Sequence, residues 1–199
     1  DLHPVHAELP ALARLATDGV RAGRLTPVFP ANTFPGHVSL ATGTFPDRHG
    51  IVDNHFVDRE KGVYRYSADA DWLEAEPLWI AAERQGVPTA TYFWVGSESD
   101  WRGQGTRYRM APFDGSRPES LKVDQILAWL RLPPAERPRL VMSYWAGADR
   151  AGHDNGPDSA EVRAALMGQD RQLARLLAGL DEDAAWGHTT LILVSDHGM

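Results

Sequence analysis

Three groups of residues in this sequence carry side chains suited to metal-dependent chemistry. The first is the pair Asp149 and His153 in SYWAGADRAGHDNGP. Because the two residues are four positions apart, a helical turn would point both side chains to the same side, where they could share a cation. The alternative is an ordinary surface pair, although the surrounding glycines and proline favour a shaped loop over a plain helix face.

The second group is the pair Asp196 and His197, which follows the apolar run TTLILVS. Two adjacent polar side chains at the end of a buried strand need hydrogen bonds or a metal ion, and metal ligation would satisfy both. A strand that leaves the core into a polar turn is the alternative, and the dipeptide alone does not separate the two. The remaining histidines of interest are expected to be structural or surface residues: His37, His49, His55 and His188.

The third group is Thr33, which precedes Phe34 and Pro35 in PANTFPGHVSL. A threonine hydroxyl is a weak nucleophile unless a base removes its proton or a cation binds its oxygen. The amides at the start of a following helix would attract an anion to the same place. The alternative is a helix N-cap, a position that favours Thr. Together with the two Asp-His pairs, Thr33 is interpreted as a nucleophile, and the three groups predict hydrolysis at phosphorus.

These groups need elements to position them, and the chain alternates helical and strand-like patterns. Apolar residues at helical spacing, with Gly or Pro near the ends, predict helices over 8–18, 35–41, 77–86, 121–130 and 159–180. Apolar runs predict strands over 20–29, 87–95, 140–145 and 189–196. This alternation predicts an α/β fold with a largely parallel sheet and helices on both faces. The three groups would then lie at the carboxyl ends of strands, where such folds place their sites.

Length and composition set further limits. The chain of 199 residues is long enough for one α/β domain, expected over 1–199 with irregular excursions near 58–71 and 96–117. No apolar run approaches the ~18 to 20 residues of a membrane span, and a net charge of -7 argues against a nucleic-acid-binding face. The absence of cysteine excludes disulfides, thiolate metal sites and thiol nucleophiles. The opening DLHPVHAELP lacks a signal-peptide pattern.

The motifs also resemble a known family. TFPGHVSLATGTFPDRHGIVDN, the segment from Asp149 to Pro157 and VSDHGM resemble the nucleotide pyrophosphatase/phosphodiesterase family of the alkaline phosphatase superfamily. EPLWIAAERQG followed by TYFWVGSE resembles it too, so the match runs over nearly the whole chain. The resemblance implies two zinc ions, attack by a threonine on phosphorus, and a covalent intermediate that water hydrolyses. It also implies a small phosphoester substrate such as a nucleotide, and a periplasmic or secreted location.

The resemblance assigns roles to the metal-binding candidates. By motif, Thr33 is the nucleophile and shares one zinc ion with Asp196 and His197, while Asp149 and His153 hold the other ion. Each of these carboxylate, imidazole and hydroxyl groups is a type of ligand or nucleophile that zinc supports.

Three further residues match positions in the family that contact substrate. Asn54, at the end of HGIVDN, matches an asparagine that hydrogen-bonds a non-bridging phosphoryl oxygen. Phe34 and Tyr144 match residues that stack on the nucleotide base or another leaving group. Core packing is the alternative for both aromatic residues, and the sequence leaves it open.

The chain also departs from the family pattern. The family's first aspartate ligand follows a strand and precedes Gly, whereas Asp1 precedes Leu2; a further histidine ligand would lie beyond Met199. We therefore expect a catalytic domain that is incomplete at both ends and that binds metal poorly by itself. A phosphate monoesterase, a phosphonoacetate hydrolase and an inactive binding homologue are the alternatives on the same scaffold. A sulfatase is disfavoured because the Cys-x-Pro-x-Arg pattern is missing.

Overall fold

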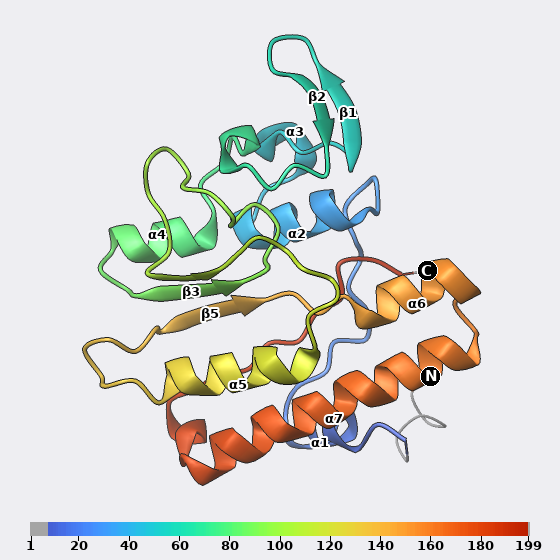
Figure 1. The fold of residues 1–199 in the computed structure, drawn as a ribbon, viewed down its shortest axis with the longest axis vertical. Coiled ribbons are helices and arrows are strands. Elements are labelled where there is room, and N and C mark those ends of the chain that lie inside the picture. Colours follow the sequence, from blue (N-terminus) through green and yellow to red (C-terminus); the bar gives the residue numbers. More distant parts are fainter. Residues whose placement is uncertain (1–7, 199) are drawn as a thin grey trace.

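A parallel three-stranded sheet lies at the centre of the molecule (Figure 1), in a computed structural model that describes residues 8–198. β3 (Thr89–Tyr92) is the middle strand, with β4 (Tyr108–Met110) on one side and β5 (Leu140–Ser143) on the other. Both pairings are parallel. Parallel strands bring their carboxyl ends to one edge of the sheet, so the loops that follow β3 and β5 leave from the same edge.

Helices cover both faces of this sheet, as the sequence predicted. Figure 1 shows α2 (Thr33–Thr42) and α4 (Leu78–Arg84) on one side, and α5 (Glu119–Leu130) and α7 (Ala160–Glu182) on the other. Alternate residues of β5 pack into the cores on the two sides of the sheet, because successive strand side chains point to opposite faces. Leu140 and Met142 join the core under α2 and α4. Val141 joins the core formed with α5 and α7.

In the layer of α5 and α7, two helices pack closely, and a side chain of α7 caps the start of a helix that is distant in sequence. A Cβ at Gly179 of α7 would lie 2.5 Å from a methyl group of Leu127, so glycine lets α7 approach α5. The buried Asp170 of α7 accepts the amide hydrogens of Ala11 and Leu12, at 3.1 and 2.8 Å. These amides belong to the first turn of α1 (Pro10–Asp18), where no side chain of the helix itself caps the backbone. α1 is thereby fixed to α7.

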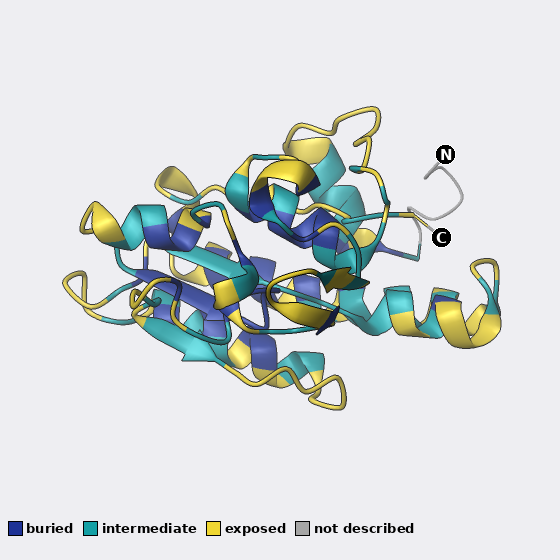
Figure 2. Ribbon diagram, turned by 90° about the horizontal axis from the view of Figure 1, so that it is seen from above, coloured by how far each residue is buried: buried dark blue, intermediate teal, exposed yellow. Residues whose placement is uncertain are grey.

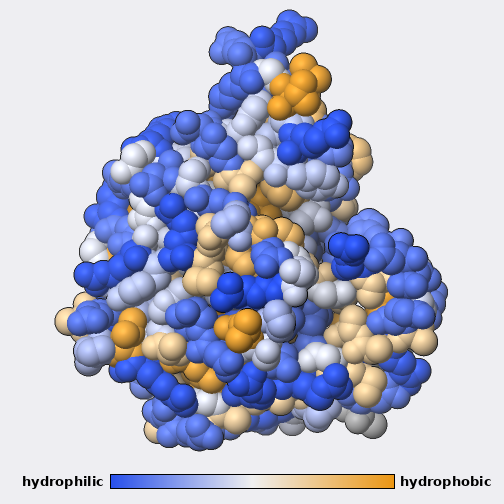
Figure 3. Space-filling model, in the orientation of Figure 1, coloured by the Kyte–Doolittle hydropathy of each residue, from blue (hydrophilic) through white to orange (hydrophobic). Residues whose placement is uncertain are grey.

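A β-hairpin stands off from the α2 side of the molecule. It consists of β1 (His55–Asp58) and β2 (Gly62–Arg65), and it is followed by η1 (Ala70–Trp72). The Asp58 carboxylate accepts amide hydrogens from Glu60 and Lys61, which closes the turn. Part of the expected irregular excursion over 58–71 is therefore regular, since it contains β2 and η1. Figure 3 shows one apolar patch just below the hydrophilic tip of this part of the surface.

Two predicted strands do not form. The stretches 20–29 and 189–196 contain no strand, and their apolar side chains are largely exposed, with Phe29 at 93% and Ile192 at 77%. Strand structure needs a hydrogen-bonded neighbour as well as an apolar sequence, and the described sheet pairs only β3, β4 and β5 with one another. Figure 2 shows that the exposed parts of the chain, drawn in yellow, are mostly loops and outer helix faces around a buried centre. Conversely, the expected excursion 96–117 contains β4.

The remaining predicted elements are present with small changes of boundary. The described elements not yet given are α3 (Pro46–His49), α6 (Gly147–Asn155) and η2 (Ala185–Gly187). α6 contains the predicted Asp149 and His153 on one helix, packed beside α7 (Figure 1). None of the helices in residues 8–198 has the length and apolar character needed to cross a membrane.

Candidate active site

Thr33 is the first residue of α2, directly after the N-cap position. Asn32 occupies that cap position in an extended conformation, but its side chain does not cap the helix and instead donates to Asp53 at 2.7 Å. The alternative interpretation of Thr33 as an N-cap is therefore wrong. The Thr33 hydroxyl remains available for other contacts, at a helix end whose amides favour an anion.

Asn54 lies beside the same helix start. Its Oδ1 accepts the amide hydrogen of Phe34 at 2.9 Å, which satisfies one of the free donors of the first turn. The amide of Asn54 is itself held by the Asp53 carboxylate at 2.6 Å. Because Oδ1 is engaged with the helix, the Asn54 NH₂ group is the part of the side chain left to donate to a ligand.

His197 contacts Thr33 although 164 positions separate them in sequence. Its Nε2 lies 3.0 Å from Thr33 Oγ1, and its Nδ1 lies 2.9 Å from the Gly198 carbonyl oxygen. A carbonyl can only accept, so Nδ1 carries the hydrogen and the lone pair of Nε2 faces the hydroxyl. That lone pair is the one an imidazole uses to bind a metal.

Two carboxylates approach the same nitrogen. Asp196 Oδ2 lies 3.3 Å and Asp149 Oδ1 lies 3.7 Å from His197 Nε2. On the far side of Asp149, His153 Nε2 lies 3.6 Å from Asp149 Oδ1. The structure thus brings Thr33, Asp149, Asp196 and His197 together, with His153 as a more exposed neighbour. Asp1, the remaining candidate ligand, lies outside the described residues.

The candidate ligand atoms match the spacing of a zinc site only in part. Within 8–198, no three His, Asp or Glu side chains are arranged so that they could hold a metal ion. The pair Asp196 and His197 is completed by a hydroxyl instead, and its donor atoms lie 3.0–3.3 Å apart. Ligand atoms of a tetrahedral zinc ion, with bonds of about 2.0–2.1 Å, lie about 3.3 Å apart. Asp149 Oδ1 is buried without a hydrogen-bond partner, as expected for an oxygen that has a cation as its partner.

Burial and neighbouring charges shift the pKa values of Asp196 and Tyr144. Burial raises the pKa of the Asp196 carboxyl, but the hydrogen bond from His37 and the nearby charges of His37 and His197 lower it by more, so this pKa lies below its ordinary value. Burial also raises the pKa of Tyr144, and the carboxylates of Asp149 and Asp196 add to the increase. The Tyr144 phenol therefore stays neutral beside the acidic cluster.

Phe34 and Tyr144 stand among other aromatic rings. The Phe34 ring makes edge contacts with Tyr64 and Tyr66, at centroid distances of 6.1 and 5.3 Å. The Tyr144 ring contacts His37 at 4.7 Å and lies 5.9 Å from Phe113. Both residues are half-buried, so core packing and substrate contact are compatible for each of them.

A buried lysine holds the end of β5, from which Tyr144 projects. Lys122 of α5 donates to the Tyr144 carbonyl and forms an ion pair with Glu119 at 2.7 Å. Its ammonium also lies 5.5 Å from the centroid of Trp145. Burial lowers the pKa of Lys122, while Glu119 opposes the change. Sequence reasoning missed this residue because a single Lys in an amphipathic helix gives no signal for such a role.

His37 is a second residue that sequence reasoning missed. It was expected to be structural or exposed, and it is buried in α2; the approach of its Nδ1 to Asp196 Oδ2, at 3.2 Å, was not predicted. The spacing of Thr33 and His37 is the same four-residue spacing as that of Asp149 and His153, and this signal was present in the sequence.

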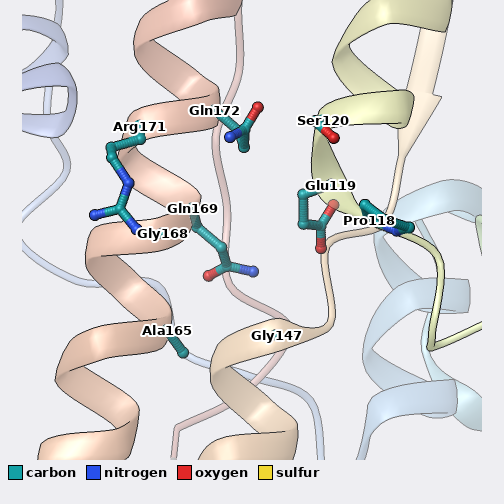
Figure 4. A pocket seen from close by; sticks show the side chains of 9 residues that line it. All are labelled: Pro118, Glu119, Ser120, Gly147, Ala165, Gly168, Gln169, Arg171 and Gln172. Carbon is teal, nitrogen blue, oxygen red and sulfur yellow. The ribbon is translucent and has the colours of Figure 1, made fainter.

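One hollow in the described structure lies away from these residues. Figure 4 shows it between the start of α5, the first residue of α6 and the middle of α7, with Glu119, Gly147 and Gln169 among its lining residues. Its volume is about 280 Å³, and none of the predicted site residues lines it. The chemistry-bearing side chains therefore meet at the surface between α2, α6 and the final segment rather than in this hollow.

Known proteins are similar to this chain in sequence. Human ectonucleotide pyrophosphatase/phosphodiesterase family member 1 is 36% identical over 204 residues, which covers 100% of this chain and 22% of that protein. The venom phosphodiesterase of Macrovipera lebetinus is 37% identical over 198 residues, covering 96% of this chain and 23% of that protein. The chain thus spans less than a quarter of these relatives.

A solved structure shares the fold. Murine ectonucleotide pyrophosphatase/phosphodiesterase 5, an inactive variant in complex with AMP, superposes with a TM-score of 0.82 at 27% sequence identity. The match covers 89% of this chain and 48% of that one. The family model described as type I phosphodiesterase/nucleotide pyrophosphatase matches residues 1–199. The chain therefore belongs to the type I phosphodiesterase/nucleotide pyrophosphatase family, whose fold is of the alkaline phosphatase type.

Proposed function

We propose that the protein containing this chain hydrolyses phosphodiester or pyrophosphate bonds, with Thr33 as the nucleophile. The observation that carries this proposal is the approach of Thr33 Oγ1, Asp196 and Asp149 to one nitrogen of His197, at 3.0, 3.3 and 3.7 Å. Family membership supports the reaction class, since the relatives are named as pyrophosphatases and phosphodiesterases.

In the proposed reaction, Thr33 Oγ1 loses its proton to water and forms a bond to phosphorus, while the bond to the leaving-group oxygen breaks and the leaving group departs with that electron pair. The product is a phosphoryl ester on Thr33 that carries the rest of the substrate, and water then cleaves it and restores the hydroxyl. The NH₂ group of Asn54 and the Thr33 amide at the start of α2 would donate to the non-bridging oxygen. Phe34 and Tyr144 would bind the organic part of the substrate.

Two zinc ions are the metals we propose. Thr33, Asp196 and His197 would hold one, and Asp149 with His153 would hold the other. Asp1 is a further candidate ligand that lies outside the described residues. Bound zinc lowers the pKa of a coordinated hydroxyl and neutralises charge that develops on the phosphoryl oxygens. The unpartnered Oδ1 of Asp149 supports this assignment.

A nucleotide is the substrate class we propose, because the murine relative is described in complex with AMP. The names of the relatives as ectoenzymes support a location outside the cytoplasm. The net charge of -7 is compatible with an anionic substrate when divalent cations supply the local positive charge.

The test compares a chromogenic phosphodiester with its monoester, using the intact protein with zinc. We expect the diester to be the better substrate, Thr33→Ala to remove at least about 99% of the turnover, and Thr33→Ser to retain part of it. Activity that survives Thr33→Ala would refute the nucleophile. Preference for the monoester would instead assign a phosphatase, and no turnover of either ester would favour an inactive homologue.

A further inference from the structure

His37 lies where the nucleophile and a candidate ligand meet. It is four residues after Thr33 on α2, and only 4% of its surface is exposed. Its Nδ1 lies 2.8 Å from the backbone oxygen of Thr33 and 3.2 Å from Oδ2 of Asp196. One ring atom therefore contacts the residue proposed to attack and a residue proposed to bind its metal.

The chemistry of these contacts determines which atom carries the hydrogen. A backbone carbonyl oxygen and a carboxylate oxygen both accept hydrogen bonds, so Nδ1 must be the donor. Its hydrogen bond is to the Thr33 oxygen, and the Asp196 carboxylate lies 3.2 Å from the same nitrogen. The contact with Asp196 restrains the rotation of that carboxylate while leaving its other lone pairs free, and it ties the final segment of the described chain to the first turn of α2.

The surroundings hold the ring in this orientation. The imidazole makes edge contacts with Trp94 and Tyr144, at centroid distances of 5.1 and 4.7 Å. Next to it, Gly36 has no side chain, and a Cβ there would lie 2.9 Å from the Asp196 backbone oxygen. Asp196 is therefore approached twice, by the backbone of α2 at Gly36 and by the ring of His37.

We propose that His37 is a positioning residue that holds Asp196 in register with Thr33, so that both can bind the same zinc ion. The inference rests on the proposed function, because it assumes that Asp196 binds metal. Partners that hydrogen-bond a metal ligand orient it and commonly change metal affinity by about 10- to 100-fold when they are removed. His37 would act through Asp196 and would not touch the substrate.

The test measures zinc affinity by competition with a chromophoric chelator, using the intact protein and variants shown by circular dichroism to be folded. His37→Leu removes the donor, and we expect zinc to bind the site of Thr33, Asp196 and His197 about 10- to 100-fold less tightly. His37→Asn places an amide NH₂ near the position of Nδ1, and it should recover most of the loss. His49→Leu is the matched control. His49 is also a buried histidine, at the end of α3, but its ring forms hydrogen bonds with Ser39 and Ile51 instead of contacting Asp196.

The outcomes separate this inference from the proposed function. If His37→Leu binds zinc as tightly as the unsubstituted protein, the inference alone is overturned. The same holds if His37→Asn loses as much zinc affinity as His37→Leu, or if the His49→Leu control loses as much as His37→Leu. Failure of the unsubstituted protein to bind zinc would overturn the proposed function and the inference with it. Long-range proton–nitrogen NMR correlations on the metal-free protein provide an independent readout: a hydrogen on Nδ1 of His37 supports the inference, and its absence overturns it.

Discussion

At the scale of single residues, the site depends on atoms that must come close without obstruction. Thr33 and His197 are far apart in the sequence, and their contact at 3.0 Å requires the final segment to lie against the first turn of α2. Gly36 permits this approach, because a Cβ there would meet the backbone oxygen of Asp196 at 2.9 Å and its Cβ at 3.2 Å.

Gly36→Ala should therefore displace Asp196 and His197. Backbone atoms cannot rotate out of the way as a flexible side chain can, and overpacking of this kind costs about 1–3 kcal/mol of folding free energy. We expect kcat/KM for a phosphodiester to fall by at least about tenfold, since small displacements at a reacting centre are costly. Steady-state kinetics and urea denaturation measure the two effects.

Gly168→Ala is the matched control, since this helical glycine of α7 has only the end of the Arg171 side chain within 3.7 Å of the added Cβ. It should gain up to about 1 kcal/mol of stability from helix propensity and keep its activity. A Gly36→Ala protein that behaves like Gly168→Ala would show that the close approach is not needed.

Residue types and spacing predicted most of the candidate site, because Asp-His pairs and a Thr before a helix are visible in the sequence. They did not predict His37, because a histidine within an apolar helix is usually structural and its partner Asp196 lies 159 positions further along the chain. The partner of a buried polar group is a tertiary property, and one sequence without a structure does not reveal it.

At the scale of elements, α3 is a short helix that a buried histidine connects to α2. His49 is fully buried, its Nε2 lies 2.8 Å from Ser39 Oγ, and its Nδ1 accepts the amide hydrogen of Ile51 at 3.2 Å. An acceptor at Nδ1 is unprotonated, so the structure holds this imidazole neutral. Burial accordingly lowers the pKa of His49 from 6.5 to about 4.

This lowered pKa predicts a loss of stability in mild acid. The unfolded chain takes up a proton near pH 6.5 and the folded protein only near pH 4, so the contribution of His49 is complete above about 6.5 and is lost as the pH falls towards about 4. The total loss is about 3 kcal/mol, since one pKa unit corresponds to about 1.4 kcal/mol. His49→Gln keeps an NH₂ donor for Ser39 but does not titrate, so its unfolding free energy should change less over this range. Equal pH dependence of the two proteins in urea denaturation would contradict the assignment.

The helices were predicted well and the strands only in part. A helix satisfies its own backbone hydrogen bonds, so spacing and terminal Gly or Pro residues were enough to identify α1, α4, α5 and α7. A strand needs a partner, and the apolar stretches 20–29 and 189–196 do not pair in the described structure. The three-residue strand β4 gave no signal because it is short and lies within a polar, glycine-rich stretch.

At the scale of the whole molecule, the two core layers support a site made from three separate stretches of chain. α2 brings Thr33 and His37, the segment after β5 brings Tyr144 and then Asp149 on α6, and the final segment brings Asp196 and His197 (Figure 1). The hydrogen bond from Lys122 to the end of β5 connects the α5 layer to this arrangement. The site therefore depends on the packing of the whole domain rather than on any one motif.

Rapid acid quenching followed by peptide mass spectrometry measures whether Thr33 becomes covalently linked to the substrate, as proposed. The intact protein, loaded with zinc and mixed with a chromogenic phosphodiester, should release leaving group in a burst and carry the remaining phosphoryl group on the peptide that contains Thr33. Thr33→Ala should show neither. Turnover with no modified Thr33 peptide at any quench time, or with the phosphoryl group on another residue, would contradict the account.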